Sequence, residues 1–300
     1  MTTPAIAPRR PVRAILGVRW LDHATGEPVL GGLHAILAPA NHTRAARTGV
    51  PGPSGIISFH RVSGMHDHEF PSEPVRPTPA PNWYVLAVSD RQRRYLPAVY
   101  FIELPRLGSA SFPGSLPTTL HPQLTLPLYS APNRIPPTGF AAVRAQVRAF
   151  ATGNPAPHAV VRVQLGAIEG DGVADREGRV LALIAPPRGD RLIAGSPPGT
   201  GQALLGRESW PVTVRVFAAA GLAPPPVAPG PGSFPLIALD VALPHPWTDL
   251  PSARTILTQG QASIVLSFPP GVPDLPETIL AGEDLVLRTM STSDLLITAA

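Results

Sequence analysis

The strongest constraint on the fold of this chain is an internal repeat of strands, turns and glycines. Residues 12–20 and 143–150 each alternate side chains as a strand does, and each run leads into a Thr-Gly-x-Pro segment, beginning at Thr25 and at Thr152. A second apolar run, glycines at identical spacing and a third apolar run follow in both copies. The matching positions are 33–37 and 160–165 for the second run, Gly49, Gly55, Gly172 and Gly178 for the glycines, and 56–59 and 180–184 for the third run. Such a repeat indicates two related units, and the alternation predicts strands.

Composition favours the same fold class. The chain of 300 residues contains 41 prolines and 27 glycines, and 44% of its residues are hydrophobic. Proline is excluded from helix interiors and central strands, so this number of prolines favours short strands joined by turns. We therefore expect an all-β protein made of two tandem immunoglobulin-like or transthyretin-like β-sandwiches with proline-rich loops.

The repeat also predicts where the chain divides. A length of 300 residues suits two domains that each bury a core. We place the first β-sandwich module at residues 10–130, a proline-rich linker at 131–137 and the second β-sandwich module at 138–300. We expect contacts with another subunit at the two long loops, residues 71–82 and 223–235, because binding residues are concentrated on loops.

Further elements are predicted outside the repeat. Residues 171–178 are interpreted as a turn, residues 105–127 as irregular chain, and residues 251–258 as the one short helical segment. Strands are expected at 83–89, 95–104, 210–218, 234–243, 262–268, 285–289 and 294–298.

Charge and targeting signals exclude several classes of protein. The formal net charge is only +4, all 24 basic residues are arginines, and no dense basic run occurs, so we do not expect nucleic-acid binding. The absence of lysine is typical of a GC-rich bacterial genome. There is no cysteine, which fits a reducing compartment. With no signal-peptide pattern and no apolar run of membrane-spanning length, we expect a cytoplasmic protein, or part of a particle assembled in the cytoplasm.

The repeated pattern resembles the carboxypeptidase regulatory-like domain, a transthyretin-like β-sandwich. In the second copy it is carried by Val147, Gly153, Pro155, Val161, Val163, Leu165, Gly172, Asp175, Gly178, Val180 and Leu183. In the first copy it is carried by Val18, Gly26, Pro28, Leu33, Ile36, Gly49, Gly55 and Ile57, without the acidic residue. The resemblance implies a non-catalytic spacer, adaptor or binding domain.

A second resemblance concerns residues 84–90, 94–98 and 103–105. Their strand-turn-strand pattern is similar to proteins found with the sheath and tube components of phage-tail-like contractile injection systems. This resemblance implies a structural adaptor or accessory at the cap, baseplate or shaft. Its partners would be other protein subunits of the particle: sheath, tube, cap or baseplate.

Side chains that could carry chemistry occur in one polar cluster, His60, His66, Asp67, His68 and Glu69. On an extended segment, His66 and His68 would point to the same side and could bind zinc with His60 or Glu69. A metal-dependent enzyme centred here is a remote alternative; an exposed polar loop is the simpler interpretation.

The remaining candidate sites are a serine nucleophile, a phosphate-binding loop, a calcium site and a carbohydrate surface. Ser54, Ser63 and Ser196 lack the Gly-x-Ser-x-Gly pattern of a hydrolase, and residues 195–201 lack the lysine of a phosphate-binding loop. Asp171, Asp175 and Glu177 could bind calcium, although an acidic turn more often caps backbone. A carbohydrate- or protein-binding β-sandwich module is a further alternative, and the candidates for its carbohydrate surface are Trp20, Trp83, Tyr84, Tyr95, Tyr100 and Phe101. We assign no catalytic, cofactor-binding or metal-binding residue and expect a non-enzymatic protein.

Overall fold

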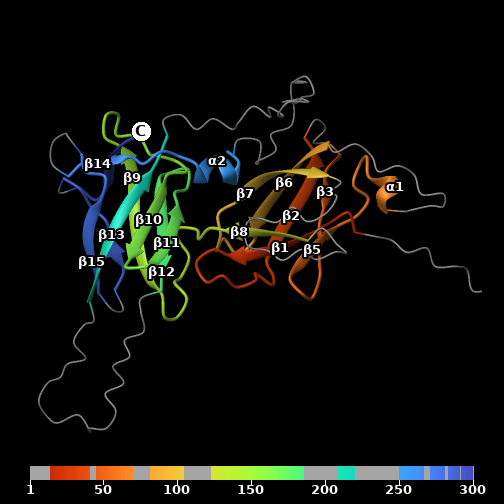
Figure 1. The fold of residues 1–300 in the computed structure, drawn as a ribbon, viewed down its shortest axis with the longest axis horizontal. Helices are drawn as coiled ribbons and strands as arrows, with labels where there is room; N and C mark the ends of the chain where they lie inside the picture. The colour runs from red at the N-terminus through yellow and green to blue at the C-terminus, as the bar shows by residue number, and fades with distance from the viewer. Residues whose placement is uncertain are drawn as a thin grey trace, which may run out of the picture.

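A computed structural model shows an almost entirely β protein (Figure 1). It describes residues 14–40, 45–69, 82–104, 123–185, 209–219, 250–266, 271–280, 283–290 and 292–299. The expected all-β class is confirmed: the strands form sheets that pack face to face as β-sandwiches.

The first half contains eight described strands and one helical turn. These are β1 (Leu16–Asp22), β2 (Leu33–Pro39), β3 (Arg47–Thr48), β4 (Val50–Pro51), β5 (Ile56–Phe59), α1 (His66–Glu69), β6 (Asn82–Asp90), β7 (Ala98–Leu104) and β8 (Gln123–Leu128). One sheet has the order β4-β5-β1-β8 and the other β3-β2-β6-β7. Their inner faces share a core that includes Trp20, Phe59, Leu37, Tyr84 and Leu86.

The second half repeats this arrangement. Its described elements are β9 (Ala141–Ala149), β10 (Val160–Leu165), β11 (Ile168–Val173), β12 (Arg179–Ile184), β13 (Ser209–Phe217), α2 (Ala253–Leu257), β14 (Ser263–Ile264), β15 (Leu275–Leu280), β16 (Leu285–Val286) and β17 (Leu295–Thr298). One sheet has the order β12-β9-β17-β14, with β16 beside β9, and the other β11-β10-β13-β15. The two sheets enclose a separate core that includes Val147, Val161, Val163, Val214 and Leu295.

The repeat found in the sequence is reproduced in the strand pairing. In the first half β1 pairs antiparallel with β5 and parallel with β8. In the second half β9 pairs in the same two ways with β12 and β17. The second sheets also correspond, because β6 lies between β2 and β7 just as β13 lies between β10 and β15.

Equivalent backbone hydrogen bonds confirm the correspondence at the Thr-Gly-x-Pro turns. Gly26 N–H donates to the Asp22 carbonyl at 2.8 Å, and Gly153 N–H donates to the Ala149 carbonyl at the same distance. Gly26 and Gly153 have φ angles of 72° and 67°, a left-handed conformation that glycine adopts without steric cost. The shared motif therefore encodes one turn geometry twice.

The prediction of a turn over residues 171–178 is wrong for its first part. Residues up to Val173 belong to β11, which pairs with β10 along its whole length. A Cβ atom on Gly172 would lie 2.6 Å from the Leu181 carbonyl oxygen of β12. Gly172 suggested a turn, but a glycine is needed here because β11 passes close to the backbone of β12.

The prediction of irregular chain up to residue 127 is also wrong at its end, where β8 forms. The strand can include Pro127 because β8 is at the edge of its sheet. On the free side of an edge strand, the N–H that proline lacks is not needed for a hydrogen bond to another strand. The edge strand β15 was missed for the same reason, since Pro276 interrupts its apolar pattern.

Several predicted elements are shorter than expected or cannot be compared. The strands expected at 95–104, 262–268 and 285–289 reduce to β7, β14 and β16. The short helix expected within 251–258 is confirmed as α2, with Ser252 as its N-cap. The strand expected at 234–243 lies outside the described residues.

Candidate functional site

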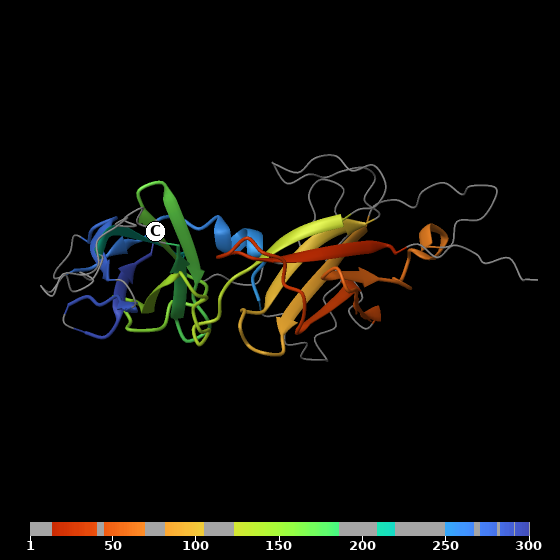
Figure 2. The ribbon, with the colours of Figure 1, turned by 90° about the horizontal axis from the view of Figure 1, so that it is seen from below.

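Polar and apolar contacts join the two halves of the described chain at their junction. Figure 2 shows α2 at this junction, beside the sheet of the first half. Leu250, just before α2, packs with Ala87 of β6 and Val99 of β7. Ile256 of α2 packs with Tyr129, near the end of the first half, and with residues of the second half. The segment around α2 therefore bridges both halves.

A buried ion pair fixes the chain where it leaves the first half. Arg134 donates to both carboxylate oxygens of Asp22, and the Arg134 and Asp22 side chains are only 9% and 6% exposed. Arg134 also donates to the Ser130 hydroxyl at 2.8 Å, and its guanidinium lies 4.8 Å from the centre of the Tyr95 ring. The expected linker at residues 131–137 is therefore anchored by side chains rather than free.

The ionisation of this cluster follows from its contacts. Burial by itself would raise the pKa of Asp22, but hydrogen bonds from Arg134 and its charge outweigh burial and leave that pKa below its ordinary value. Burial, together with the charge of Asp22, raises the pKa of Tyr95 to about 12. At neutral pH the carboxylate is charged and the phenol is protonated, which lets Tyr95 donate to Asp22 at 3.2 Å.

Arg144 of β9 ties the same part of the linker to the second half. Its guanidinium donates to the carbonyl oxygens of Pro132 and Arg134, and its Nε donates to Asp284 at 2.7 Å. Because these bonds join the linker to the sheet of the second half, they oppose rotation of one half against the other.

A third set of contacts crosses directly between the halves. His23, after β1, lies 3.9 Å from Asp171 of β11, and its ring packs 4.6 Å from the Tyr129 ring. Burial lowers the pKa of His23 against the raising effect of Asp171, so the imidazole is neutral at neutral pH. Ala24 packs on a small apolar cluster formed by strands of the second half.

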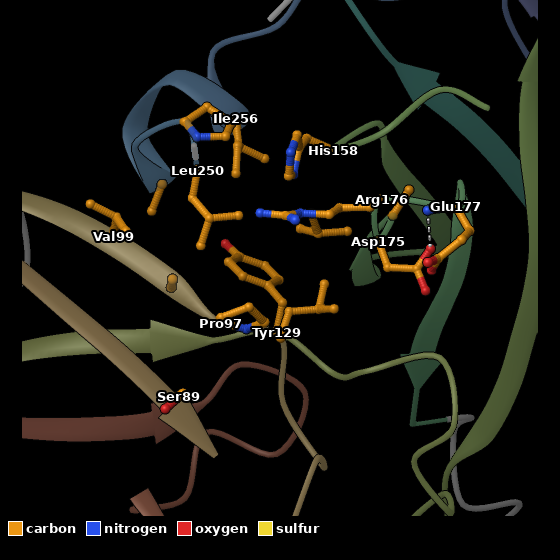
Figure 3. A pocket seen from close by; sticks show the side chains of 16 residues that line it. Ser89, Pro97, Val99, Tyr129, His158, Asp175, Arg176, Glu177, Leu250 and Ile256 are labelled. Carbon is orange, nitrogen blue, oxygen red and sulfur yellow. Dashed lines mark hydrogen bonds between the residues drawn. The ribbon is translucent and has the colours of Figure 1, made fainter. Parts of the chain in front are cut away.

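A pocket of about 530 Å³ lies beside these contacts (Figure 3). Its walls come from the start of β7, from Tyr129, from the turn between β11 and β12, and from the α2 segment. Most of the lining is apolar, and the main apolar side chains are Leu96, Pro97, Val99, Val173, Leu250 and Ile256. Ligand sites in proteins commonly have this size and occur where two structural units meet.

One side of the pocket is polar. Figure 3 shows the Arg176 side chain extending into the pocket between the His158 ring and the Tyr129 hydroxyl. Burial, followed by the charge of Arg176, lowers the pKa of His158, so the imidazole is neutral at neutral pH. His158 also has a φ of 63°, an uncommon conformation for a residue with a side chain.

The sequence-predicted polar cluster has a different conformation from the one expected. Residues 66–69 form the helical turn α1 and not an extended segment, so the predicted pairing of His66 and His68 on one side is wrong. Glu69 is buried, accepts a hydrogen bond from the Arg61 N–H at 2.8 Å and lies 3.4 Å from His60. Within the described residues, no group of three His, Cys, Asp or Glu side chains could hold a metal ion.

The aromatic candidates do not form one exposed surface. Trp20, Tyr84 and Tyr95 are buried in the core, and the Tyr100 ring packs 5.8 Å from Trp20. Trp83 of β6 and Phe101 of β7 are half-buried, and Phe101 packs on a separate cluster with Ala87, Val99 and Leu250. Hence the structure does not bring the six residues together as a flat platform.

The remaining candidates have structural partners or lie outside the described residues. Asp175 caps the turn before β12 and pairs with Arg179, which also binds Glu177; Asp171 pairs with Arg162. Ser54 and Ser63 are in exposed turns. Ser196, the surrounding glycine-rich segment and the loops proposed to contact other subunits (71–82 and 223–235) lie outside the described residues, except for Asn82, which begins β6.

Sequence reasoning missed the junction itself. Asp22 and Arg134 are 112 positions apart, and Gln259 donates to the His158 carbonyl across 101 positions. No local pattern marks such pairs. The one available signal was a difference between the two copies of the repeat. Asp22 corresponds to Ala149, and Arg176 corresponds to Pro53, so neither side chain is part of the repeated pattern.

Comparisons with known proteins show only weak structural likeness. No family model matches the sequence, and no curated protein matches it. Among solved structures, the chain is similar to the Bacillus anthracis TIE protein, with 13% identity over 69% of this chain and 28% of that one, at a TM-score of 0.24. It is also similar to BcpA, the major pilin subunit of Bacillus cereus, with 10% identity over 68% of this chain and 63% of that one, at a TM-score of 0.22. The chain thus spans less than two thirds of either protein. Among its described helices, neither is long and apolar enough to cross a membrane.

Proposed function

We propose that this protein is a non-enzymatic structural adaptor, whose two sandwiches are held at a fixed spacing so that other protein subunits can bind to each. Following the resemblance noted in the sequence, we assign it to a contractile, phage-tail-like injection particle. There it would be an accessory of the cap, baseplate or shaft, assembled in the cytoplasm with sheath, tube or baseplate subunits.

The observation that carries this proposal is that side-chain contacts hold the linker between the two halves in place. Two tethered domains that need not keep a fixed geometry are commonly joined by a free linker. Here the buried Asp22–Arg134 pair joins the linker to the first half, and Arg144 joins it to the second half. The segment around α2 contacts both halves. Such a junction is useful where the distance between two binding surfaces matters.

The sandwiches also have edges that a partner could use. In the described part of the chain, β7 and β15 end one sheet of each half, and β4 and β14 are short edge strands of the other sheets. An unpaired strand edge can accept a strand from another chain through backbone hydrogen bonds. Only β7 and β15 are equivalent edges, because each lies beside the matching strand, β6 or β13, of its half. Through this pair one adaptor would offer two similar surfaces.

The test is co-sedimentation with particles from the source cells. Quantitative mass spectrometry should find this chain at a constant ratio to sheath and tube proteins across preparations. In cells lacking the sheath protein, the chain should leave the sedimented fraction, and an abundant cytoplasmic protein serves as the negative control. Particles that never contain the chain, or sedimentation that does not depend on the sheath, would contradict the proposal.

A further inference from the structure

The pocket at the junction contains one charge that the fold does not use. Arg176 makes no hydrogen bond or ion pair with any other residue that the structure describes. Asp175 and Glu177 also line the pocket, but their carboxylates are bound by Arg179, at 2.9 Å and 2.7 Å, and not by Arg176. The arginine therefore keeps its full capacity to bind an anion.

The turn that carries Arg176 does not require an arginine. The equivalent turn of the first half closes with the same backbone bonds, from Gly52 N–H to the Ile56 carbonyl at 2.8 Å and from Gly55 N–H to the Gly52 carbonyl at 3.1 Å. Its second position is Pro53, which corresponds to Arg176. Since the same turn forms with proline, the arginine has no role in the backbone geometry that would explain its presence.

The surroundings of Arg176 combine apolar walls with further polar groups. Leu250 and Ile256 from the α2 segment and Val99 from β7 line the same space. The His158 ring and the Tyr129 hydroxyl are on either side of the arginine (Figure 3). A guanidinium binds a carboxylate with two parallel hydrogen bonds, and the apolar walls favour a ligand with an apolar body.

We propose that this pocket binds a small amphipathic carboxylate, with its carboxylate against Arg176 and its apolar body between α2 and β7. The volume of about 530 Å³ is in the range that holds small organic ligands. The site does not depend on the adaptor role, because it is formed within one chain. A ligand here would touch both halves and would stabilise their contact.

The experiment is calorimetric titration of the full chain with decanoate, using decanol as the uncharged probe of matched length. Decanoate should bind, and Arg176→Gln should lower the affinity for decanoate roughly tenfold. This is the effect of losing one charged hydrogen-bond partner. Arg176 is exposed, so this variant should fold as the original does. Arg91→Gln is the matched control, because Arg91 is an exposed arginine that does not line the pocket.

A photoactivatable decanoate, followed by peptide mass spectrometry, locates the bound probe. Labelling of residues 96–99 or 250–256 supports the site. The proposal is overturned if decanoate does not bind, if decanol binds as tightly, if Arg176→Gln binds decanoate like the original protein, or if the label is found away from these segments. None of these outcomes bears on co-sedimentation with particles, so the two proposals fail separately.

Discussion

At the scale of single residues, the junction depends on a charge pair that the sandwich fold itself does not need. The position equivalent to Asp22 in the second half is Ala149, and the Thr-Gly-x-Pro turn forms there with the same backbone bonds. Asp22 is thus placed for its contacts with Arg134 and Tyr95. Removing one member of a buried pair is costly, because the other charge remains buried without a partner.

We predict that Asp22→Asn lowers the free energy of unfolding by about 3–5 kcal/mol, the usual cost of breaking a buried ion pair. Asp274→Asn is the matched control, since Asp274 pairs with Arg215 at 2.7 Å but is 45% exposed. It should cost about 1 kcal/mol or less. Urea denaturation of both variants measures the difference, and equal effects would show that burial of the Asp22 pair has no special role.

The same residue predicts a dependence on pH. Because the pKa of Asp22 is lowered in the folded protein from its ordinary value of 3.8, its stabilising contribution is complete above that value. It is lost as the pH falls through the lower folded-state pKa. Melting temperatures should therefore fall more for the original protein than for Asp22→Asn between neutral pH and about pH 2.5. Parallel acid profiles would contradict this account.

At the scale of elements, the contact between β11 and β12 depends on the absence of side chains. Gly170 and Gly172 pass the backbone of β12 so closely that a Cβ atom would lie 2.3 Å and 2.6 Å from its carbonyl oxygens. In the first half Gly49 is also closely packed, but against side chains: a Cβ atom there would lie 2.3 Å from the Ile57 side chain. The first glycine of the repeated pair, Gly49 or Gly172, is thus a packing requirement, whereas the second, Gly55 or Gly178, has a left-handed φ of 74° or 80°.

We predict that Gly172→Ala destabilises the protein by about 1–3 kcal/mol, the cost of overpacking, because the facing atoms are backbone and cannot rotate away. At Gly31, where a Cβ atom meets nothing within 4 Å, alanine should change stability by less than about 1 kcal/mol, and in the stabilising direction. Chemical denaturation of the two variants provides the comparison. If Gly172→Ala behaves like Gly31→Ala, the close approach of the two strands is incorrect.

Elements were predicted from sequence where local pattern decides them. The alternation in β1 and β9 was sufficient for those two strands, and α2 forms within the range predicted for a short helix. Edge strands such as β8 and β15 were missed, because a proline is tolerated only where the sheet ends, and sequence alone does not show which strand is at the edge. The pocket was beyond prediction, since it joins segments such as β7 and α2 that are far apart in the chain.

At the scale of the whole molecule, the two sandwiches are similar units with different surroundings. The cores are separate, and the contacts between them come from the linker, the turn after β1 and α2. Two residues that differ between the copies, Asp22 in one and Arg176 in the other, both lie at this junction. The repeat supplies two copies of one scaffold, and the differences between the copies fix their relative position.

The most direct test of a fixed junction is the distribution of distances between spin labels placed in the two halves. The chain contains no cysteine, so Ser54→Cys with Thr278→Cys introduces two labels only, both at exposed positions outside the junction. Pulsed electron paramagnetic resonance should give a single narrow distance distribution, which broadens when Asp22→Asn is added. A broad distribution in the doubly labelled protein without Asp22→Asn, as expected for two domains on a flexible tether, would contradict the account.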